Sequence, residues 1–343
     1  MELSTSSQLL KKPKDYNKSD VGPITGELSG SPEIPAVEFA ALLLSLEHNV
    51  GMPTETVYGL AASIHSQKAL ENIFSLKERP FFDPLIVHVS NRSQLTEVVG
   101  EWSSLSQMLS EEFWPGPLTL VVPKKKELNA LITSGLETVA VRMPSHPMAQ
   151  EMIERLGHPV AAPSANKFGK TSPTRAEHVE ESFPNLYVLP SGPSEWGVES
   201  TVIQIEGEKV FLLRPGAITQ EDLDRVLNRE GYEPVIVSEK VNSPGHLKHH
   251  YQPEKPLFII RTPKSLPRQV VGEIVSHSLK GEEISLSPDP RIAARGLYSQ
   301  LREKSQSEAD YLYLVWPNHF KGDLWEAIWD RVKRAATEIV ETQ

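Results

Sequence analysis

The stretch PTETVYGL, residues Pro53–Leu60, crowds two threonine hydroxyls, a carboxylate and a phenol between a proline and a glycine. Apolar runs lie close to it on both sides, so folding buries part of it. Each polar group that is buried without a partner costs about 1–3 kcal/mol. A core strand has no use for so many polar groups in so few residues. We therefore expect this stretch to line a cleft that binds a polar ligand.

Composition narrows the class of protein. The chain has 343 residues, which is long for one ordinary domain and suits two. It has no cysteine, which excludes structural disulfides, zinc fingers, iron–sulfur clusters and thiol nucleophiles, and which fits a cytoplasmic location. No apolar run approaches the roughly 20 residues that span a bilayer, so we expect no membrane contact.

The charge of the chain bears on its partners. The net charge of −10 argues against stable nucleic-acid binding, because that affinity depends on basic surfaces that neutralise phosphate. A local basic cleft for a small anion is compatible with an acidic chain.

The succession of segments predicts two domains. We expect residues 1–30 to form a flexible extension, 31–235 a first α/β domain, 236–256 a linker or lid, and 257–343 a small second domain. In the first domain, periodicity and caps predict a mixed sheet with helices. The predicted helices are Pro35–Asn49, Gln67–Arg79 and one that runs from the capping box Thr219–Asp222 to Gly231. The predicted strands are Asn49–Pro53, Leu85–Val89, Leu118–Val122, Val139–Met143 and Val160–Ala162, followed by a hairpin of Thr201–Ile205 with Val210–Leu213.

The second domain alternates strands with helices. Its predicted segments are Leu257–Ile260, Gln269–Leu279, Ile284–Leu286, Arg291–Arg302, Tyr311–Trp316 and Leu324–Val340. Such alternation predicts a small parallel α/β domain. It contains no glycine-rich dinucleotide fingerprint, so we assign it no cofactor.

Several polar residues have both a structural and a functional interpretation. Lys77 and Arg79 end a predicted helix, where the helix dipole alone favours cations, and the alternative is that they bind a phosphate or carboxylate. Ser164 and Asn166 follow an apolar strand, as in an ordinary turn or in a ligand site at a strand terminus. Ser172 is expected to cap the next helix, and a helix N-terminus also suits phosphate.

Buried charges raise the same question. Arg142 lies in the apolar strand VAVRMP and must be paired, either with an internal carboxylate or with one on a substrate. His88 in LIVHV is more often a core histidine than a catalyst, and Arg214 at the end of a strand can be structural. Glu199 and Ser200 are expected to form a turn into a strand.

Two kinds of catalytic site find no support in the sequence. No GxSxG motif occurs, and no base is placed for a Ser–His–Asp triad. His246, His249 and His250 lie in a segment rich in proline and lysine, so we expect a solvated linker there and not a metal site.

The order of the motifs is more specific than any one of them. PTETVYGL, KER-P, PLIVHV, WPGPLTLVV, VAVRMP, APSAN, SPT, GVESTV and LRPG follow one another in an order that closely resembles the YrdC-like domain of threonylcarbamoyl-AMP synthases. The linker SPGHLKHHYQPEKP and the tail resemble those of the two-domain form of that family. The resemblance implies a YrdC-like mixed twisted sheet with flanking helices and a concave cleft, followed by a small Rossmann-like parallel α/β domain.

The resemblance also implies an activity. Members of this family form L-threonylcarbamoyl-AMP and pyrophosphate from L-threonine, bicarbonate and ATP, with Mg²⁺ accompanying the ATP. The chain is thus expected to be a nucleotidyltransferase that hands its product to a complex that modifies adenosine beside the anticodon of tRNA. A dedicated protein site for the metal is not expected.

The family's functional positions fall on polar residues that can perform their roles. The resemblance implies catalytic roles for Lys77, Arg79, Ser164 and Asn166, contacts to L-threonine from Thr56, His88, Arg142 and Ser200, and contacts to ATP from Arg79, Asp83, Thr138, Ser164, Ser172, Arg214 and Tyr251.

Two other classes of function compete with this one. An RNA-binding or ribosome-associated module of the same fold would use a concave basic surface, and the net charge of −10 weighs against it. A carbamoyl-transfer enzyme of hydrogenase maturation contains a related domain, but such proteins add cysteine-based zinc modules, and this chain has no cysteine.

Overall fold

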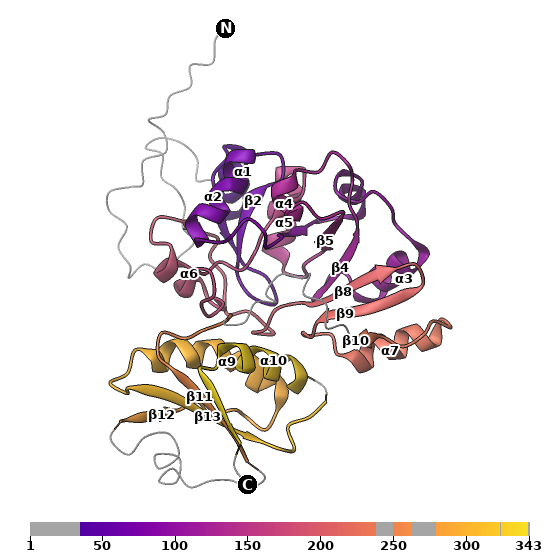
Figure 1. Cartoon of the computed structure of the whole chain (residues 1–343). Coiled ribbons are helices and arrows are strands. Elements are labelled where there is room, and N and C mark those ends of the chain that lie inside the picture. The colour runs from indigo at the N-terminus through magenta and orange to yellow at the C-terminus, as the bar shows by residue number, and fades with distance from the viewer. Residues whose placement is uncertain (1–34, 238–249, 263–278, 323, 342–343) are drawn as a thin grey trace.

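The computed structural model describes residues 35–237, 250–262, 279–322 and 324–341. It contains two α/β units, and Figure 1 draws the larger one above the smaller one. The upper unit contains, in chain order, α1 (Ala36–Ser45), β1 (Val50–Met52), β2 (Gly59–Ser63), α2 (Gln67–Lys77), β3 (Ile86–His88), a 3-10 helix (Arg92–Glu97), α3 (Ser104–Phe113), β4 (Leu118–Pro123), α4 (Ala130–Thr133), β5 (Thr138–Arg142), α5 (Pro147–Leu156), β6 (Val160–Ala161), α6 (Ala176–Ser182), β7 (Tyr187–Val188), β8 (Thr201–Glu206), β9 (Lys209–Arg214), α7 (Gln220–Arg229) and β10 (Ile236–Val237). The lower unit contains β11 (Leu257–Thr262), β12 (Gly281–Glu283), α9 (Pro290–Ser305), β13 (Tyr311–Pro317), α10 (Trp325–Ala335) and β14 (Glu338–Glu341).

Each unit is built on one sheet. The described strands of the first sheet lie in the order β10-β9-β8-β4-β5-β3-β6-β2-β1-β7, with parallel and antiparallel neighbours. Those of the second lie in the order β12-β13-β11-β14, and every pair is parallel. The predicted fold class, a mixed sheet followed by a small parallel α/β domain, is confirmed.

The two faces of the first sheet differ in what covers them. Val87, Leu120 and Val141 point into the main apolar core, whereas their neighbours Ile86 and Ala140 belong to a small apolar cluster on the opposite face. Adjacent residues of a strand point to opposite faces, so His88 and Arg142, which pair directly in the parallel register of β3 and β5, share the face of Ile86. Two of the predicted site residues, His88 and Arg142, therefore lie on this face.

Local sequence fixes the turn that follows α2. Ser66 caps the helix by accepting a hydrogen bond from the Ala69 N–H, and the buried side chains of Leu70, Ile73 and Phe74 hold its apolar face against the core. The helix ends at Lys77 because Glu78 adopts a left-handed conformation, with φ of 56°. This turn directs Arg79 back toward the sheet.

The second unit presents its helices to the first. Figure 1 shows α9 and α10 between the four-stranded sheet and the larger unit. Val57 and Val198 of the larger unit pack in the same apolar cluster as Leu297 of α9 and Ile328 of α10. The two units therefore share buried apolar surface.

Most predicted segments agree with the structure, and two are wrong. The helix predicted over Leu324–Val340 ends at Ala335, because residues 338–341 form β14 beside β11. The strand predicted at Ile284–Leu286 lies at Gly281–Glu283 instead, where Gly281 pairs with Tyr311. The extension at 1–30 and all but the last residue of the Gln269–Leu279 segment lie outside the described residues.

Candidate active site

The PTETVYGL segment meets two segments that lie far from it in sequence. The Leu60 N–H donates to the Pro163 carbonyl at 2.7 Å, and the Ala165 N–H donates to the Tyr58 carbonyl at 2.8 Å. The Tyr58 N–H donates to the Pro173 carbonyl at 2.9 Å. The motifs PTETVYGL, APSAN and SPT thus form one continuous wall.

The polar side chains of that wall have internal partners. Thr54 Oγ1 donates to the Val57 carbonyl at 2.6 Å and shares a hydrogen bond with Thr56 Oγ1. The Tyr58 hydroxyl donates to the Ser191 carbonyl, so this phenol points away from the cleft. Burial of these groups is tolerated because hydrogen bonds replace the water that each one loses.

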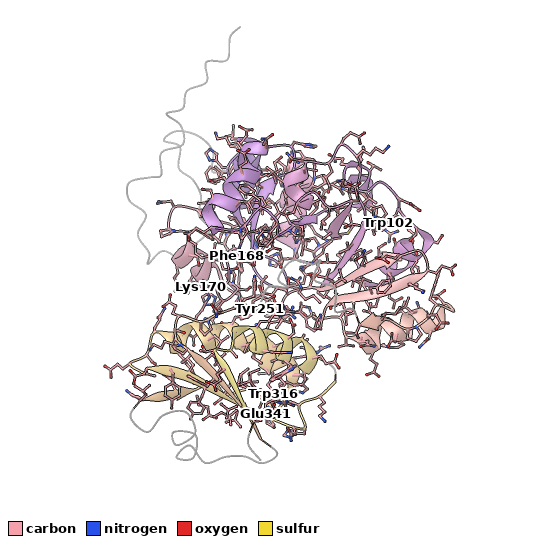
Figure 2. The ribbon with its side chains drawn as sticks, viewed as in Figure 1. Trp102, Phe168, Lys170, Tyr251, Trp316 and Glu341 are labelled. Atoms are coloured by element: carbon pink, nitrogen blue, oxygen red, sulfur yellow. The ribbon has the colours of Figure 1, made fainter. Side chains whose placement is uncertain are left out.

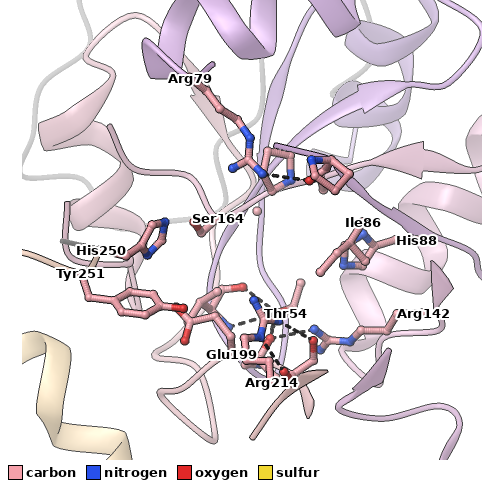
Figure 3. Close-up of a pocket in the computed structure, with 17 residues that line it drawn as sticks. Thr54, Arg79, Ile86, His88, Arg142, Ser164, Glu199, Arg214, His250 and Tyr251 are labelled. Atoms are coloured by element: carbon pink, nitrogen blue, oxygen red, sulfur yellow. Dashed lines mark hydrogen bonds between the residues drawn. The ribbon is translucent and has the colours of Figure 1, made fainter. Parts of the chain in front are cut away.

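A pocket opens between this wall and the face of the sheet that carries Ile86 and His88 (Figure 3). Eight of the residues predicted for the site line it, namely Thr56, Arg79, His88, Arg142, Ser164, Ser200, Arg214 and Tyr251. Its other lining residues include Thr54, Glu199 and His250, for which the sequence analysis predicts no role in the site. Three guanidinium groups and one carboxylate therefore face one small volume.

Arg142 reaches the pocket from β5. Its Nη2 lies 2.6 Å from Glu55 Oε1, its Nη1 donates to Thr56 Oγ1 at 2.9 Å, and its Nε donates to the Gly116 carbonyl at 3.3 Å. Of the two pairings that the sequence left open for this arginine, the structure contains the internal one. Arg142 thereby fixes the PTET turn against the sheet.

Arg79 enters from the opposite end of the pocket, as Figure 3 shows. It forms an ion pair of 2.9 Å with Asp83 and donates to the Asp83 and Pro84 carbonyls. Burial raises the pKa of Asp83, although the nearby positive charge of Arg79 opposes this effect. Asp83 does not line the pocket itself, and it acts on the pocket through Arg79.

Lys77 and Asn166 lie behind the pocket wall. The Lys77 ammonium donates to the Ser164 and Asn166 carbonyls at 2.5 and 2.6 Å, and burial lowers its pKa well below the ordinary value. Asn166 Nδ2 donates to the Lys167 and Lys170 carbonyls. Both side chains shape the backbone around Ser164, and neither lines the pocket.

Glu199 is the centre of a buried network. Its carboxylate accepts hydrogen bonds from Ser172 Oγ at 2.6 Å, from the Tyr298 hydroxyl at 3.0 and 3.1 Å, and from Arg331 Nε at 2.8 Å. Burial alone would raise the pKa of Glu199, but the charges of Arg331 and then Arg214 outweigh it and hold the pKa at about 2. The prediction that Ser172 caps the next helix is wrong, because α6 begins after Arg175 with no side-chain cap, and the Ser172 hydroxyl donates to Glu199 instead.

Ser200 and Arg214 are bonded to each other. Arg214 Nε donates to the Ser200 carbonyl at 3.1 Å, and its Nη2 donates to Ser200 Oγ at 3.0 Å. Ser200 Oγ also shares a hydrogen bond of 2.7 Å with Thr119 Oγ1. The segments GVESTV and LRPG thus present a hydroxyl and a guanidinium at one place.

The described end of the linker closes one side of the pocket. Tyr251 lies at the boundary between the two units (Figure 2), is 1% exposed, and has a left-handed backbone with φ of 67°. His250 packs edge-on against its ring and is 6% exposed, and burial lowers the pKa of His250 to about 3. The prediction of a solvated His250 is wrong, because Gln252 anchors the segment by donating to the Gly169 carbonyl. His246 and His249 lie outside the described residues.

Two predicted residues differ in their relation to the pocket. Burial, and then the charge of Arg142, lower the pKa of His88 to about 3, so its ring is neutral at pH 7. Its Nδ1 has no hydrogen-bond partner among the described residues, and the side chain faces the pocket. Thr138 lies at the other end of β5 from Arg142, opposite Pro123, and does not line the pocket.

Each of the three carboxylates near the pocket forms an ion pair with an arginine. Glu55 pairs with Arg142, Asp83 with Arg79, and Glu199 with Arg331. In the described part of the chain, no group of three or more histidine, aspartate or glutamate side chains could hold a metal ion. The residues present therefore do not fit a metal site made by the protein alone.

Comparison with known proteins identifies relatives of this chain. Residues 43–216 match the family described as "Telomere recombination", and residues 218–337 match "Threonylcarbamoyl-AMP synthase, C-terminal domain". The chain is 36% identical over 283 residues to the threonylcarbamoyl-AMP synthase of Pyrococcus abyssi, covering 77% of this chain and 83% of that one. It is 37% identical over 311 residues to the enzyme of the same name from Bacillus subtilis, covering 84% and 89%.

A solved structure is similar over nearly the whole chain. The crystal structure of P. abyssi Sua5 complexed with L-threonine superposes with a TM-score of 0.81 at 32% identity, over 91% of this chain and 98% of that one. In the residues that our structure describes, no helix is both long and apolar enough to cross a membrane.

Proposed function

The chain belongs to the threonylcarbamoyl-AMP synthase family, and from that premise we propose that its pocket joins L-threonine, bicarbonate and ATP into L-threonylcarbamoyl-AMP and pyrophosphate. It is an enzyme that performs a nucleotidyltransferase-type reaction. The fold and the identity to the named relatives support this function over the RNA-binding module, as does the acidity of the chain.

The observation that carries the proposal is the convergence of Arg79, Arg142 and Arg214 on one pocket of an otherwise acidic protein. Triphosphate, carbamate and amino-acid carboxylate are all anions, and they must be held together for reaction. Fixed guanidinium groups in a buried site stabilise such charges far more than they would in water. Three arginines that come from different segments also orient the partners, which supplies much of the rate.

We assign the two substrates to two adjoining parts of the pocket, which meet where Arg214 donates to Ser200. L-threonine would lie against Thr56, His88, Arg142 and Ser200, where the neutral His88 ring and two hydroxyls accompany one cation. ATP would lie along Arg79, Ser164, Arg214 and Tyr251. Asp83, Ser172, Lys77 and Asn166 would act on ATP through the groups that they hold, and a contact from Thr138 requires a nucleotide that reaches beyond the pocket lining.

The chemistry demands little of the side chains beyond placement. Bicarbonate gives carbon dioxide and hydroxide. The threonine amine attacks the carbon dioxide and becomes N-carboxythreonine, and the proton that the amine loses combines with the hydroxide to leave as water. An oxygen of that carboxylate then attacks the α-phosphate, and pyrophosphate leaves with the electron pair of the broken P–O bond. Arg79 and Arg214 would stabilise the charge that develops on the phosphates.

Mg²⁺ would enter with the nucleotide. The three nearby carboxylates are paired with arginines, so we propose that the ion is held by the phosphates and water, as is usual for Mg²⁺ with nucleotides. When bound, it would neutralise part of the charge of the triphosphate.

His250 and Tyr251 would shield the reaction from water. Their burial over the pocket supports a shielding role for this end of the linker, since water would hydrolyse both the carbamate and the mixed anhydride. The product would then pass, in the cytoplasm, to a complex that transfers the threonylcarbamoyl group to tRNA.

Pyrophosphate release by the purified chain tests the function. The assay contains ATP, Mg²⁺ and bicarbonate, with and without L-threonine, and mass spectrometry identifies the adenylate. Release that depends on both threonine and bicarbonate is the expected result. If the folded protein binds ATP but releases no pyrophosphate under any of these conditions, the synthase function is wrong for the isolated chain, and salt-dependent RNA binding becomes the next measurement.

A further inference from the structure

The C-terminal unit packs against the back of the pocket wall. Val57 of PTETVYGL and Val198 of GVESTV are buried within its apolar core. Gly197, with φ of 69°, lies so close to α9 that a Cβ there would be 2.5 Å from the Cα of Arg295. The backbones of the two units are therefore in direct contact beside Glu199.

Arg331 of α10 joins two segments of the larger unit. It is fully buried, its Nε donates to Glu199 Oε2 at 2.8 Å, and its Nη1 donates to the Pro215 carbonyl. Tyr298 of α9 donates to the same Glu199 carboxylate. Two helices of the second unit thus hold one carboxylate that lines the pocket.

In each of the two segments that Arg331 contacts, a residue adjacent to the contacted one lines the pocket. Ser200 follows Glu199, Arg214 precedes Pro215, and these two neighbours are bonded to each other through Ser200 O and Oγ. The segments are in backbone contact, because a Cβ on Gly216 would lie 2.3 Å from the Thr201 nitrogen. A movement of either segment would separate the hydroxyl from the guanidinium.

We propose that Arg331 and Tyr298 are positioning residues of the reaction: from the second unit they hold Glu199 and Pro215 so that Ser200 and Arg214 face the substrates in register. This inference rests on the proposed function. Neither side chain lines the pocket. Both act through Glu199 and through the Tyr251 ring, which lies 5.7 Å from the Tyr298 ring and from the Arg331 guanidinium, and Arg331 also acts through Pro215. Arginine suits the task because its fork donates in two directions from one rigid plane, whereas lysine is a point charge.

The first test replaces Arg331 with lysine. Arg331→Lys keeps the positive charge beside Glu199 but cannot reach two acceptors with a planar fork. Arg225→Lys, the same substitution at an exposed position of α7, is the matched control. Both are assayed well below their unfolding temperatures, for kcat and for the KM of threonine and of ATP, and thermal unfolding is recorded alongside.

We expect Arg331→Lys to lose about tenfold or more in kcat/KM, because a shift of about 1 Å in a reacting geometry can cost 10²-fold. The control should match the wild type. If the variant unfolds earlier on heating but retains wild-type kcat and KM at low temperature, the residue serves stability alone and the proposal is wrong.

Tyr298→Phe is the second variant, for the case in which Arg331→Lys does not fold. It removes one hydroxyl from Glu199 and keeps the shape of the packed ring. A folded Tyr298→Phe enzyme with a changed kcat or KM supports positioning, and one with unchanged kinetics overturns it. A wild-type protein that itself shows no threonine-dependent release would refute the proposed function instead, and binding of ATP and threonine by calorimetry would then compare the variants without turnover.

Discussion

At the scale of single residues, the pocket consists of arginines that already have partners. Arg142 contacts a carboxylate, a hydroxyl and a carbonyl, and each contact fixes one part of the PTET turn. Removal of the Arg142 side chain would leave Glu55 buried and unpaired, which costs about 3–5 kcal/mol. A variant such as Arg142→Ala would therefore lose stability, and this loss could not be separated from a loss of substrate binding. Lysine is the more informative replacement.

We expect Arg142→Lys to raise the KM for L-threonine about tenfold or more and to change the KM for ATP little. The ammonium keeps a charge near Glu55, but it cannot also donate to Thr56 and Gly116 in the plane of a guanidinium. Steady-state pyrophosphate release at saturating ATP gives the threonine KM, and the converse titration gives the ATP KM. An equal rise in both constants would contradict the assignment of Arg142 to the threonine part of the pocket.

Lys77 acts on a neighbouring piece of backbone. Lys77→Met should lower the free energy of unfolding by about 2 kcal/mol, because the Ser164 and Asn166 carbonyls lose their shared donor while buried. Activity should fall as well, since Ser164 lines the pocket. Denaturant unfolding measures the first effect. The control is Lys170→Met, which alters an exposed side chain in the loop that follows Ser164 and Asn166, and it should leave the free energy of unfolding unchanged.

At the scale of elements, close backbone contacts limit substitution more than charge does. Gly216 has no positive φ, yet a Cβ there would collide with the Thr201 nitrogen and the Ser200 carbonyl carbon. We expect Gly216→Ala to force apart the segments before β8 and after β9 and to lower kcat/KM at least about tenfold. Gly192→Ala is the matched control, because no atom lies within 4 Å of its added Cβ. Equal activities for the two variants would show that the contact is not needed.

Elements with strong local signals could be predicted, and those that depend on pairing could not. The capping box at Thr219 and Asp222 fixed the start of α7, and both of its hydrogen bonds are present. β2, with the sequence GLAAS, has little strand propensity, and it forms because β1 and β6 flank it. β14 was mistaken for the end of a helix, since Ile339 and Val340 continue an apolar pattern and only β11 makes them a strand.

Two other helices, α3 and α5, carry clear local signals in the sequence. Ser103 caps α3 by accepting from the Ser106 N–H. Pro147 begins α5, and Gly157, with φ of 85°, ends it. These helices could have been predicted from caps alone.

At the scale of the whole molecule, eight of the residues that the family resemblance implies for the site line one pocket. The sequence could not reveal the role of Glu199, because its partner Arg331 lies 132 residues further along the chain. The prediction that His250 is solvated is wrong for a related reason. The polar composition around it is typical of a linker, while its burial depends on packing against Phe168 and Tyr251.

The charge of the whole chain also gains an explanation at this scale. The net charge of −10 coexists with a pocket that three arginines line, and this combination suits an enzyme whose substrates are small anions. The carboxylates nearest the pocket each offset one arginine, which limits the cost of burying so many cations before the substrates bind.

The link between the two units should depend on pH through Glu199. The carboxyl has an ordinary pKa of 4.5 and a pKa of about 2 in the folded protein, where Arg331 and Arg214 face it together with Ser172 and Tyr298. A lowered pKa stabilises the folded state fully above the ordinary value, and this stabilisation disappears as the pH falls toward the folded value. The free energies of unfolding of the wild type and Glu199→Gln, measured between pH 7 and pH 3, test this dependence.

The glutamine variant should be less stable by about 3 kcal/mol at pH 7, because Arg331 keeps its buried charge beside a neutral amide. That difference should be constant down to about pH 4.5 and should narrow below it, since only the wild type then loses stabilisation by taking up a proton at this site. Glu326→Gln, at an exposed position of α10, should follow the wild type at every pH. A difference that stays the same from pH 7 to pH 3 would mean that the charge of Glu199 does not hold the two units together, and the shared apolar contacts of Val57 and Val198 would then account for the docking.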